Sequence, residues 1–241
     1  MSGHSKWSTI KRAKAVNDAK KGAIFTKISN LITMAVKEKG SDIDSNFTLR
    51  MAIDKAKMAN MPKDNIERAI KRGTGELAGD QIEELYYEGM GPVNSQFIVK
   101  CLTDNKNRSA SSIRHIFSKY GGALSSVMWN FDKRGVISFK KAQIKDLDID
   151  KEVLELELID TGAEDIKIED EDYVIYTQVS DLQTVKEVLE NKNINIESAD
   201  LNYIAKDEQA IPETDRDKVE NFVNALEDDE DVSDYYTNLK L

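Results

Sequence analysis

The sequence predicts an α+β fold with three domains: a helical bundle at the N-terminus and two ferredoxin-like α/β domains, one inserted in the other. Three observations support this prediction. Apolar residues recur at three- and four-residue spacing through the first 75 residues, which is the period of amphipathic helices. Short runs rich in Val, Ile, Phe and Tyr follow, and helical patterns separate them. From residue 135 to 206 the order is strand, helix, strand, strand, helix, strand, which is a split βαβ arrangement.

Three helices are expected in the basic N-terminal region. The first carries its apolar residues over 24–36 and ends before a glycine. The second covers residues 49–59 and ends at Pro62, because proline disfavours helix in the residue before it. The third covers residues 64–72, with Asp64 as its cap.

The rest of the chain alternates between strands and helices. Expected strands lie at residues 84–88, 96–102, 126–131, 135–139, 165–169, 173–177 and 198–204, and expected helices at 109–120, 150–160, 181–191 and 215–226. A helix and a last strand near the C-terminus resume the unit that the first two strands begin. The predicted domains are therefore a basic helical domain at 1–75, a discontinuous α/β domain at 76–134 plus 207–241, and an inserted acidic ferredoxin-like domain at 135–206.

Charge is sorted by position along the chain. Residues 1–75 carry 16 Lys and Arg against 7 Asp and Glu, whereas residues 142–241 carry 9 against 30. Phosphate backbones attract clustered cations, so a basic head on an acidic protein predicts a nucleic-acid contact surface. The candidate contact residues are Lys6, Trp7, Lys11, Arg12, Lys14, Lys20, Lys21, Lys27, Lys63, Arg68, Lys71 and Arg72. For one exposed lysine a solvated side chain is the better interpretation, so the prediction rests on the clustering.

A polar loop separates the expected strand at 96–102 from the helix that follows. Its candidate partner-binding residues are Asp104, Asn105, Lys106, Asn107 and Arg108. Loops between regular elements often carry function, so we expect this loop to contact a partner.

Patterns for catalysis, metals and cofactors are weak. Cys101 as a nucleophile with His115 as its base is conceivable, but Cys101 lies in an apolar strand, and buried cysteines are common and inert. Asp146 begins a spacing similar to a calcium loop, but Lys151 stands where that loop needs glycine. The glycines match no phosphate-binding loop. We expect no catalytic residues, no metal and no cofactor, and therefore a protein that is not an enzyme.

The apolar pattern also bears on location. No apolar run of about 18 residues occurs, and the N-terminus has no apolar signal core. The single cysteine excludes a disulfide within the chain. These features predict a cytoplasmic protein that contacts no membrane.

Longer motifs occur along most of the chain. They are Gly3-His4-Ser5-Lys6-Trp7, Phe25-Thr26-Lys27, Asn60 to Ile70, Leu102 to Arg108, Arg114 to Lys119 with Gly121-Gly122, and Tyr236-Thr237-Asn238. In this order they resemble the YebC-type family of probable transcriptional regulatory proteins, which is related to mitochondrial translational activators of cytochrome c oxidase subunit I. The resemblance implies a helical N-terminal domain and two α/β domains. One departure is Val93-Asn94, where the family commonly has a second glycine pair.

The leading hypothesis is a DNA-binding transcriptional regulator whose basic helical domain grips a phosphate backbone, while the acidic domains position it or recruit protein partners. Residues 64–72 offer only Asn65 as a short amide for reading bases, which favours recognition of the backbone. One alternative is a translational activator bound to RNA or the ribosome. A second alternative is a protein-interaction scaffold that binds no nucleic acid.

Overall fold

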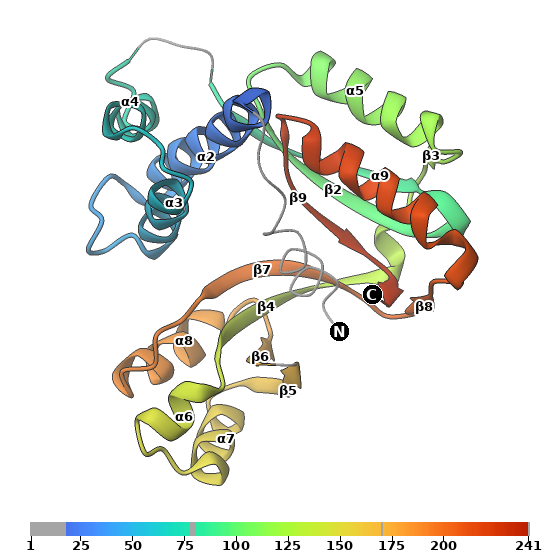
Figure 1. Ribbon diagram of the computed structural model, residues 1–241. Helices are drawn as coiled ribbons and strands as arrows, with labels where there is room; N and C mark the ends of the chain where they lie inside the picture. Colours follow the sequence, from blue (N-terminus) through green and yellow to red (C-terminus); the bar gives the residue numbers. More distant parts are fainter. Residues whose placement is uncertain (1–17, 78–80, 170, 241) are drawn as a thin grey trace. The chain divides into compact units, whose positions relative to one another are not determined.

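The computed structural model describes residues 18–77, 81–169 and 171–240 (Figure 1). These residues form helices and mainly antiparallel sheets, so the predicted α+β class is confirmed. The chain divides into two compact units. We call residues 129–207 the inserted unit, and the described residues on either side of it the main unit. The finer division into three domains stays a prediction.

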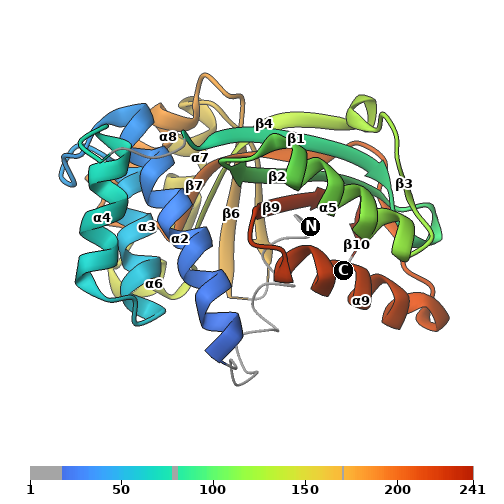
Figure 2. The ribbon, with the colours of Figure 1, turned by 90° about the horizontal axis from the view of Figure 1, so that it is seen from above.

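The main unit begins with helices α2 (Asp18–Lys39), α3 (Phe47–Met58) and α4 (Lys63–Gly73). Figure 2 shows α3 and α4 beside α2. Their apolar faces share one core, whose buried members are Ile28, Ile32, Ala35, Val36, Leu49, Ala52, Ile53, Ala56, Met61 and Ala69. The helices expected from apolar periodicity are therefore present.

The fully buried side chain of Asn46 joins α2 to α3. Its Oδ1 accepts a hydrogen bond from Leu49 N (3.0 Å), which caps the N-terminus of α3. Its Nδ2 donates to the carbonyl oxygens of Ala35 (2.8 Å) and Gly40 (2.7 Å), at the C-terminal end of α2. One amide thus satisfies backbone groups at two helix ends.

Helix α4 ends directly against α2. A Cβ atom on Gly73 would lie 2.6 Å from Val36 Cβ, so only glycine allows this approach without a shift of one helix. The prediction that Asp64 caps the N-terminus of α4 is wrong. The helix begins at Lys63, directly after Pro62, and Asp64 lies in its first turn. Proline is well suited to this end because its φ is already fixed near the helical value and the helix start needs no amide hydrogen from it.

An antiparallel sheet follows in the main unit, with the strand order β3-β1-β2-β9. Its strands are β1 (Glu83–Met90), β2 (Gln96–Thr103), β3 (Ala123–Leu124) and β9 (Val232–Thr237). Helices α5 (Lys106–Lys119) and α9 (Arg216–Asp228) lie side by side against it (Figure 2). The inserted unit interrupts the chain between β3 and α9, so this sheet combines segments from both sides of the insertion.

The core between this sheet and its helices centres on Phe222 of α9. The ring centroid of Phe222 lies 4.9 Å from that of Phe97 on β2 and 5.0 Å from that of Phe117 on α5. The ring of Tyr120 lies 5.9 Å away. Aromatic contacts therefore join segments that precede and follow the inserted unit. Short strands β8 (Gln209–Ala210) and β10 (Leu239–Lys240) add a parallel pair to the main unit.

The turn between β1 and β2, η2 (Pro92–Asn94), holds two residues in the left-handed region. The φ angle is 55° at Val93 and 58° at Asn94. A β-branched residue rarely adopts this conformation, and glycine adopts it freely. The glycine pair that the resembling family commonly has here would therefore relieve strain. In this chain Gln209 Nε2 donates a hydrogen bond to Val93 O (2.8 Å), which helps to hold the turn.

The inserted unit has the expected split βαβ order. Its elements are β4 (Phe131–Lys140), α6 (Ala142–Asp146), α7 (Lys151–Asp160), β5 (Ala163–Glu169), β6 (Asp172–Thr177), α8 (Leu182–Asn191) and β7 (Ser198–Ala205). The strand order is β5-β6-β4-β7, and all neighbours are antiparallel. Phe139 and Tyr173 stack with ring centroids 5.1 Å apart, and Leu154 and Leu158 of α7 are buried. The order of strands and helices expected from the sequence is therefore confirmed for this unit.

The prediction of a strand at residues 126–131 is wrong for residues 126–130, because β4 begins only at Phe131. This segment is irregular and ends in a 3₁₀ turn, η3 (Met128–Asn130). The carboxylate of Glu88 accepts hydrogen bonds from Val127 N (2.8 Å) and Met128 N (2.7 Å). These amides are satisfied by a side chain, so they do not pair in a strand ladder.

Candidate nucleic-acid interface

The predicted phosphate contacts fall into groups. Lys6, Trp7, Lys11, Arg12 and Lys14 lie outside the described residues. Lys20 and Lys21 belong to the start of α2, and Lys27 lies farther along the same helix. Lys63, Arg68, Lys71 and Arg72 belong to α4. The described part of the chain therefore shows Lys27 and the α4 cations in detail.

The cations of α4 are all exposed. Lys63 Nζ lies 3.5 Å from Glu67 Oε1, an exposed ion pair of small energetic weight. Within the described ranges, the side chains of Arg68, Lys71 and Arg72 form no ion pair or hydrogen bond. Their spacing of three and four residues places these three cations on one helix face. We call Arg68, Lys71 and Arg72 the α4 cationic face.

The opposite side of α4 fixes this orientation. Ala69 is buried in the helical core, and Thr33 Oγ1 of α2 donates a hydrogen bond to Ala69 O (3.1 Å). With this side held against α2, the cationic face points outward. Lys71 and Arg72 in the last turn also offset the negative end of the helix dipole. Helix stability alone therefore accounts for part of their presence.

Lys27 is partly buried and has a partner within the main unit, so the structure gives it an internal role, and its role as a phosphate contact stays a prediction. Its Nζ donates to the carbonyl oxygen of Glu227 in α9 (2.5 Å). Burial lowers the pKa of Lys27, although the charges of Asp229 and Glu227 act in the opposite direction. One turn later, Asn30 Nδ2 donates to Leu102 O (3.1 Å). Lys27 and Asn30 therefore dock α2 onto the α/β part of the main unit.

In the predicted partner loop, the side chains of Asn105 and Lys106 make contacts within the main unit. Asn105 Oδ1 accepts a hydrogen bond from Arg108 N (3.0 Å) and caps α5. Lys106 Nζ pairs with Glu83 Oε2 at 2.8 Å. The sequence signal at these positions is thus explained by the start of a helix, as is common for an asparagine after a strand.

Arg108 joins the same loop to the segment before β9. Its Nε and Nη2 donate to the two carboxylate oxygens of Asp231 (3.1 and 2.6 Å), and Nη2 also donates to Asp104 Oδ1 (3.0 Å). Ser109 Oγ donates to Asp231 Oδ2 (2.8 Å). Asp231 is only 4% exposed, and the hydrogen bonds to it raise the pKa of Arg108. These contacts give the exposed guanidinium of Arg108 an internal carboxylate partner, so part of the sequence signal at Asp104 and Arg108 is structural, and their partner role stays a prediction. Asn107 is exposed.

The alternative sites considered from the sequence are structural. Cys101 is buried in the core formed by the main sheet, α5 and α9, whereas His115 is exposed on α5, so they form no catalytic pair. In the calcium-like spacing, Asp150 Oδ1 accepts hydrogen bonds from Glu152 N (2.9 Å) and Val153 N (3.2 Å). Asp150 is therefore the cap of α7.

The Cys101 thiol is expected to be unreactive in the native protein. Burial raises its pKa to about 12, and the charges of Asp229 and Asp231 act in the same direction. A thiol reagent at about pH 8 should therefore label Cys101 only after unfolding, because the thiolate is the nucleophile. Mass spectrometry after timed incubation measures this, with urea-unfolded protein as the control. Labelling of native and unfolded protein at the same rate would contradict the buried position.

Helix α5 carries two exposed cations outside the predicted set. Arg114 and Lys119 are on the exposed side of α5. The signal that could have identified them is the composition of that helix, which has basic residues but no Asp or Glu.

The fold defines the chain as an α+β protein with N-terminal helices, a main sheet and an inserted split βαβ unit. The chain belongs to the TACO1/YebC family: residues 5–76 match the family's N-terminal domain, and residues 82–239 match its second and third domains. The resemblance inferred from sequence motifs is therefore confirmed.

Relatives and a solved structure match almost the full length. A probable transcriptional regulatory protein of Thermoanaerobacter pseudethanolicus is 46% identical over 244 residues, covering 100% of this chain and 98% of the relative. One of Bacillus licheniformis is 45% identical over 242 residues, covering 99% and 100%. The crystal structure of a conserved hypothetical protein from Aquifex aeolicus matches with a TM-score of 0.78 and 39% identity, covering 98% of this chain and 97% of that one. The two sequence relatives are thus named as probable transcriptional regulatory proteins.

Proposed function

We propose that this protein is a DNA-binding transcriptional regulator that holds the phosphate backbone through its N-terminal helices. The observation that carries the proposal is the α4 cationic face, whose three side chains are exposed and unpaired within the described residues. A surface cation that is already in an ion pair must break that pair before it binds phosphate. The three cations of the α4 cationic face have no such pair to break. The names of the relatives support a role in transcription.

The proposed contact is to the backbone rather than to bases. Arginine and lysine neutralise phosphates and release counterions whatever the sequence. Base reading by a helix needs amide or guanidinium groups near its N-terminal end, where α4 has Asn65, which is partly buried, between Asp64 and Glu67. The cations lie instead in the second half of the helix. Specificity would then come from nucleic-acid shape or from protein partners of the acidic regions.

A second candidate function follows from the same feature. A surface that binds only phosphates does not by itself distinguish DNA from RNA. The second candidate is therefore a translational activator that contacts RNA on the ribosome. Either version places the protein in the cytoplasm and involves no catalysed reaction. Within the described ranges, no helix has the length and apolar character needed to cross a membrane.

Sequencing of nucleic acid crosslinked to the protein in cells, combined with sedimentation of the protein with ribosomes, distinguishes the candidates. Recovery of discrete promoter DNA supports the transcriptional regulator. Enrichment of ribosomal RNA, together with ribosome co-sedimentation, supports the translational activator. Recovery of neither would contradict both and would leave a protein-interaction scaffold.

The α4 cationic face should account for part of the salt dependence of binding. We expect the triple variant Arg68→Gln, Lys71→Gln and Arg72→Gln to reduce the slope of log K against log salt by about 2–3 and affinity by about 10–100-fold. Glutamine keeps the helix propensity high, so the change is confined to charge. Fluorescence anisotropy with a mixed-sequence DNA duplex and its RNA counterpart, at several salt concentrations, measures both quantities.

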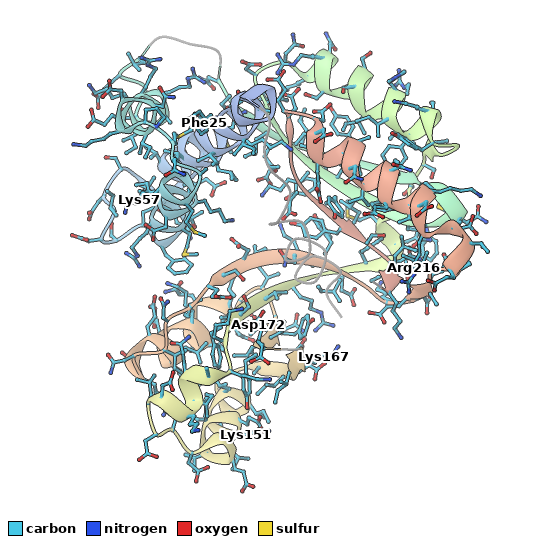
Figure 3. All side chains as sticks on the ribbon, in the orientation of Figure 1. Phe25, Lys57, Lys151, Lys167, Asp172 and Arg216 are labelled. Atoms are coloured by element: carbon cyan, nitrogen blue, oxygen red, sulfur yellow. The ribbon has the colours of Figure 1, made fainter. Side chains whose placement is uncertain are left out.

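The matched control removes three exposed cations from the acidic region. It is Lys145→Gln, Lys151→Gln and Lys167→Gln; Lys151 and Lys167 are labelled on the inserted unit in Figure 3. Its change in net charge is the same, but we expect the salt slope to stay at the wild-type value. Equal slopes for wild type and the α4 variant would remove the physical basis of the proposal.

A further inference from the structure

Helix α5 has an unusual charge composition for this protein. Its residues include Lys106, Arg108, Arg114 and Lys119 but no Asp or Glu, although the chain as a whole carries a formal net charge of −10. The helix lies on the surface of the main unit, with one side against the sheet and α9. An acid-free helix in an acidic protein concentrates positive potential at one place.

The side chains on the inward side and in the first turn of α5 make contacts within the main unit. Ser109, Ile113, Ile116 and Phe117 are buried. The cations of the first turn serve the internal ion pairs described above. In addition, Ser112 Oγ donates a hydrogen bond to Asp229 Oδ2. The helix is therefore fixed in place, and what it presents outward is held in a defined orientation.

The outward side consists of cations and small polar groups. Its exposed residues are Asn107, Ser111, Arg114, His115, Ser118 and Lys119. Among the described residues, the side chains of Arg114 and His115 form no ion pair or hydrogen bond. Lys119 Nζ lies 5.4 Å from the ring centroid of Tyr120, a contact that leaves the ammonium exposed. None of the large apolar side chains exposed in the described structure comes from α5.

We infer that this outward side of α5, which we call the α5 polar face, is a second phosphate-contact surface for nucleic acid. The inference rests on the proposed function, and it adds a site on the α/β part of the main unit to the one on α4. The composition of the face decides between occupants. Phosphate oxygens are bound by Arg and Lys together with the small donors Ser and Asn, which allow the backbone to approach closely. A protein partner would need apolar or aromatic anchors, and the face has none.

The α5 polar face also explains why the protein can be acidic overall and still bind a polyanion. Screening limits the repulsion from distant carboxylates to about 8–10 Å at physiological salt, so local charge decides the contact. On the outward side of α5 the charges are those of Arg114 and Lys119, five residues apart, with no carboxylate on the same helix. The carboxylate of Asp229, which lies against this helix, is hydrogen-bonded to Ser112. The face is thus a separate contribution and not an extension of the basic N-terminal sequence.

The test uses full-length protein with the double substitution Arg114→Gln and Lys119→Gln. With a fluorescent mixed-sequence DNA duplex and its RNA counterpart as probes, we expect the slope of log K against log salt to fall by about 2, since each phosphate contact contributes about 0.9 on B-DNA. Affinity should fall about 5–30-fold at physiological salt. A second variant, Ser111→Glu, puts a carboxylate in the middle of the face and should weaken binding in the same direction. The control is Lys145→Gln with Lys167→Gln, which changes net charge equally on the inserted unit.

The outcomes separate this inference from the proposed function. A flatter salt slope in both the α4 triple variant and the α5 double variant supports both. A flatter slope in the α4 variant, with wild-type slopes for Arg114→Gln/Lys119→Gln and wild-type affinity for Ser111→Glu, overturns the α5 site and leaves the proposed function intact. Failure of the wild-type protein to bind either probe overturns both. All substituted side chains are exposed, and unchanged thermal midpoints would verify that the variants are folded.

Discussion

Replacing Arg108 with alanine is expected to lower the free energy of unfolding of the main unit by about 2–4 kcal/mol. The substitution removes two guanidinium hydrogen bonds from Asp231 and leaves its carboxylate buried, with Ser109 still donating. Breaking a buried ion pair by removing one partner typically costs ~3–5 kcal/mol. The side chain of Arg108 is 52% exposed, so water replaces part of what is lost, and the expected cost is smaller. Urea denaturation of full-length protein measures it.

Two further variants separate the lost ion pair from lost packing. Asp231→Asn removes the charge but keeps the shape, so adding Arg108→Ala to that variant should cost about 1 kcal/mol or less. Arg114→Ala is an exposed change on the same helix and should cost no more than about 0.5 kcal/mol. If Arg108→Ala is as mild as Arg114→Ala, the pair with Asp231 contributes little to stability, and the exposed guanidinium of Arg108 is better explained by contact with a partner.

Elements with a periodic signal could be predicted from the sequence. Helix α3 buries Leu49, Ile53 and Ala56, at the three- and four-residue spacing from which it was expected. The split βαβ unit was predicted for the same reason, since its strands and helices each have their own period. Element ends were less certain. Asp64 has the chemistry of a cap, yet Pro62 starts α4 earlier, and pattern alone does not decide between two suitable starts.

Contacts between segments far apart in the sequence could not be predicted from the periodicity of apolar residues. Lys27 meets Glu227 across 200 residues, and Arg108 meets Asp231 across 123. In the sequence Lys27 and Lys71 look alike, since each is a lysine on an amphipathic helix. Their difference arises because Glu227 of α9 offers a backbone carbonyl oxygen to Lys27, whereas among the described residues no group pairs with the side chain of Lys71. By contrast, the basic character of α5 is a local property of fourteen residues and was readable without the fold.

The substitution Phe222→Ala is expected to have the largest effect on stability, lowering the free energy of unfolding of the main unit by about 3–5 kcal/mol. Phe222 is fully buried and contacts the rings of Phe97, Phe117 and Tyr120. Phe97 lies on β2, whereas Phe117 and Tyr120 lie in α5 and directly after it, so the cavity cannot close by the movement of one side chain. Phe222→Leu keeps most of the volume and should cost about 1.5 kcal/mol or less. A cost below about 1 kcal/mol for alanine would mean that the core collapses around the cavity.

The loss of stability in Phe222→Ala is also expected to be confined to one part of the protein. Phe222 lies after the inserted unit in sequence but packs on residues before it, so its loss should loosen α5 and α9 together. Helices α7 and α8 belong to the other compact unit and should keep their protection. Hydrogen exchange followed by mass spectrometry measures each helix separately in Phe222→Ala. Faster exchange in α5 and α9 alone would also show that the α5 polar face depends on this core for its fixed orientation, whereas equal acceleration in α7 and α8 would show that the two units unfold as one.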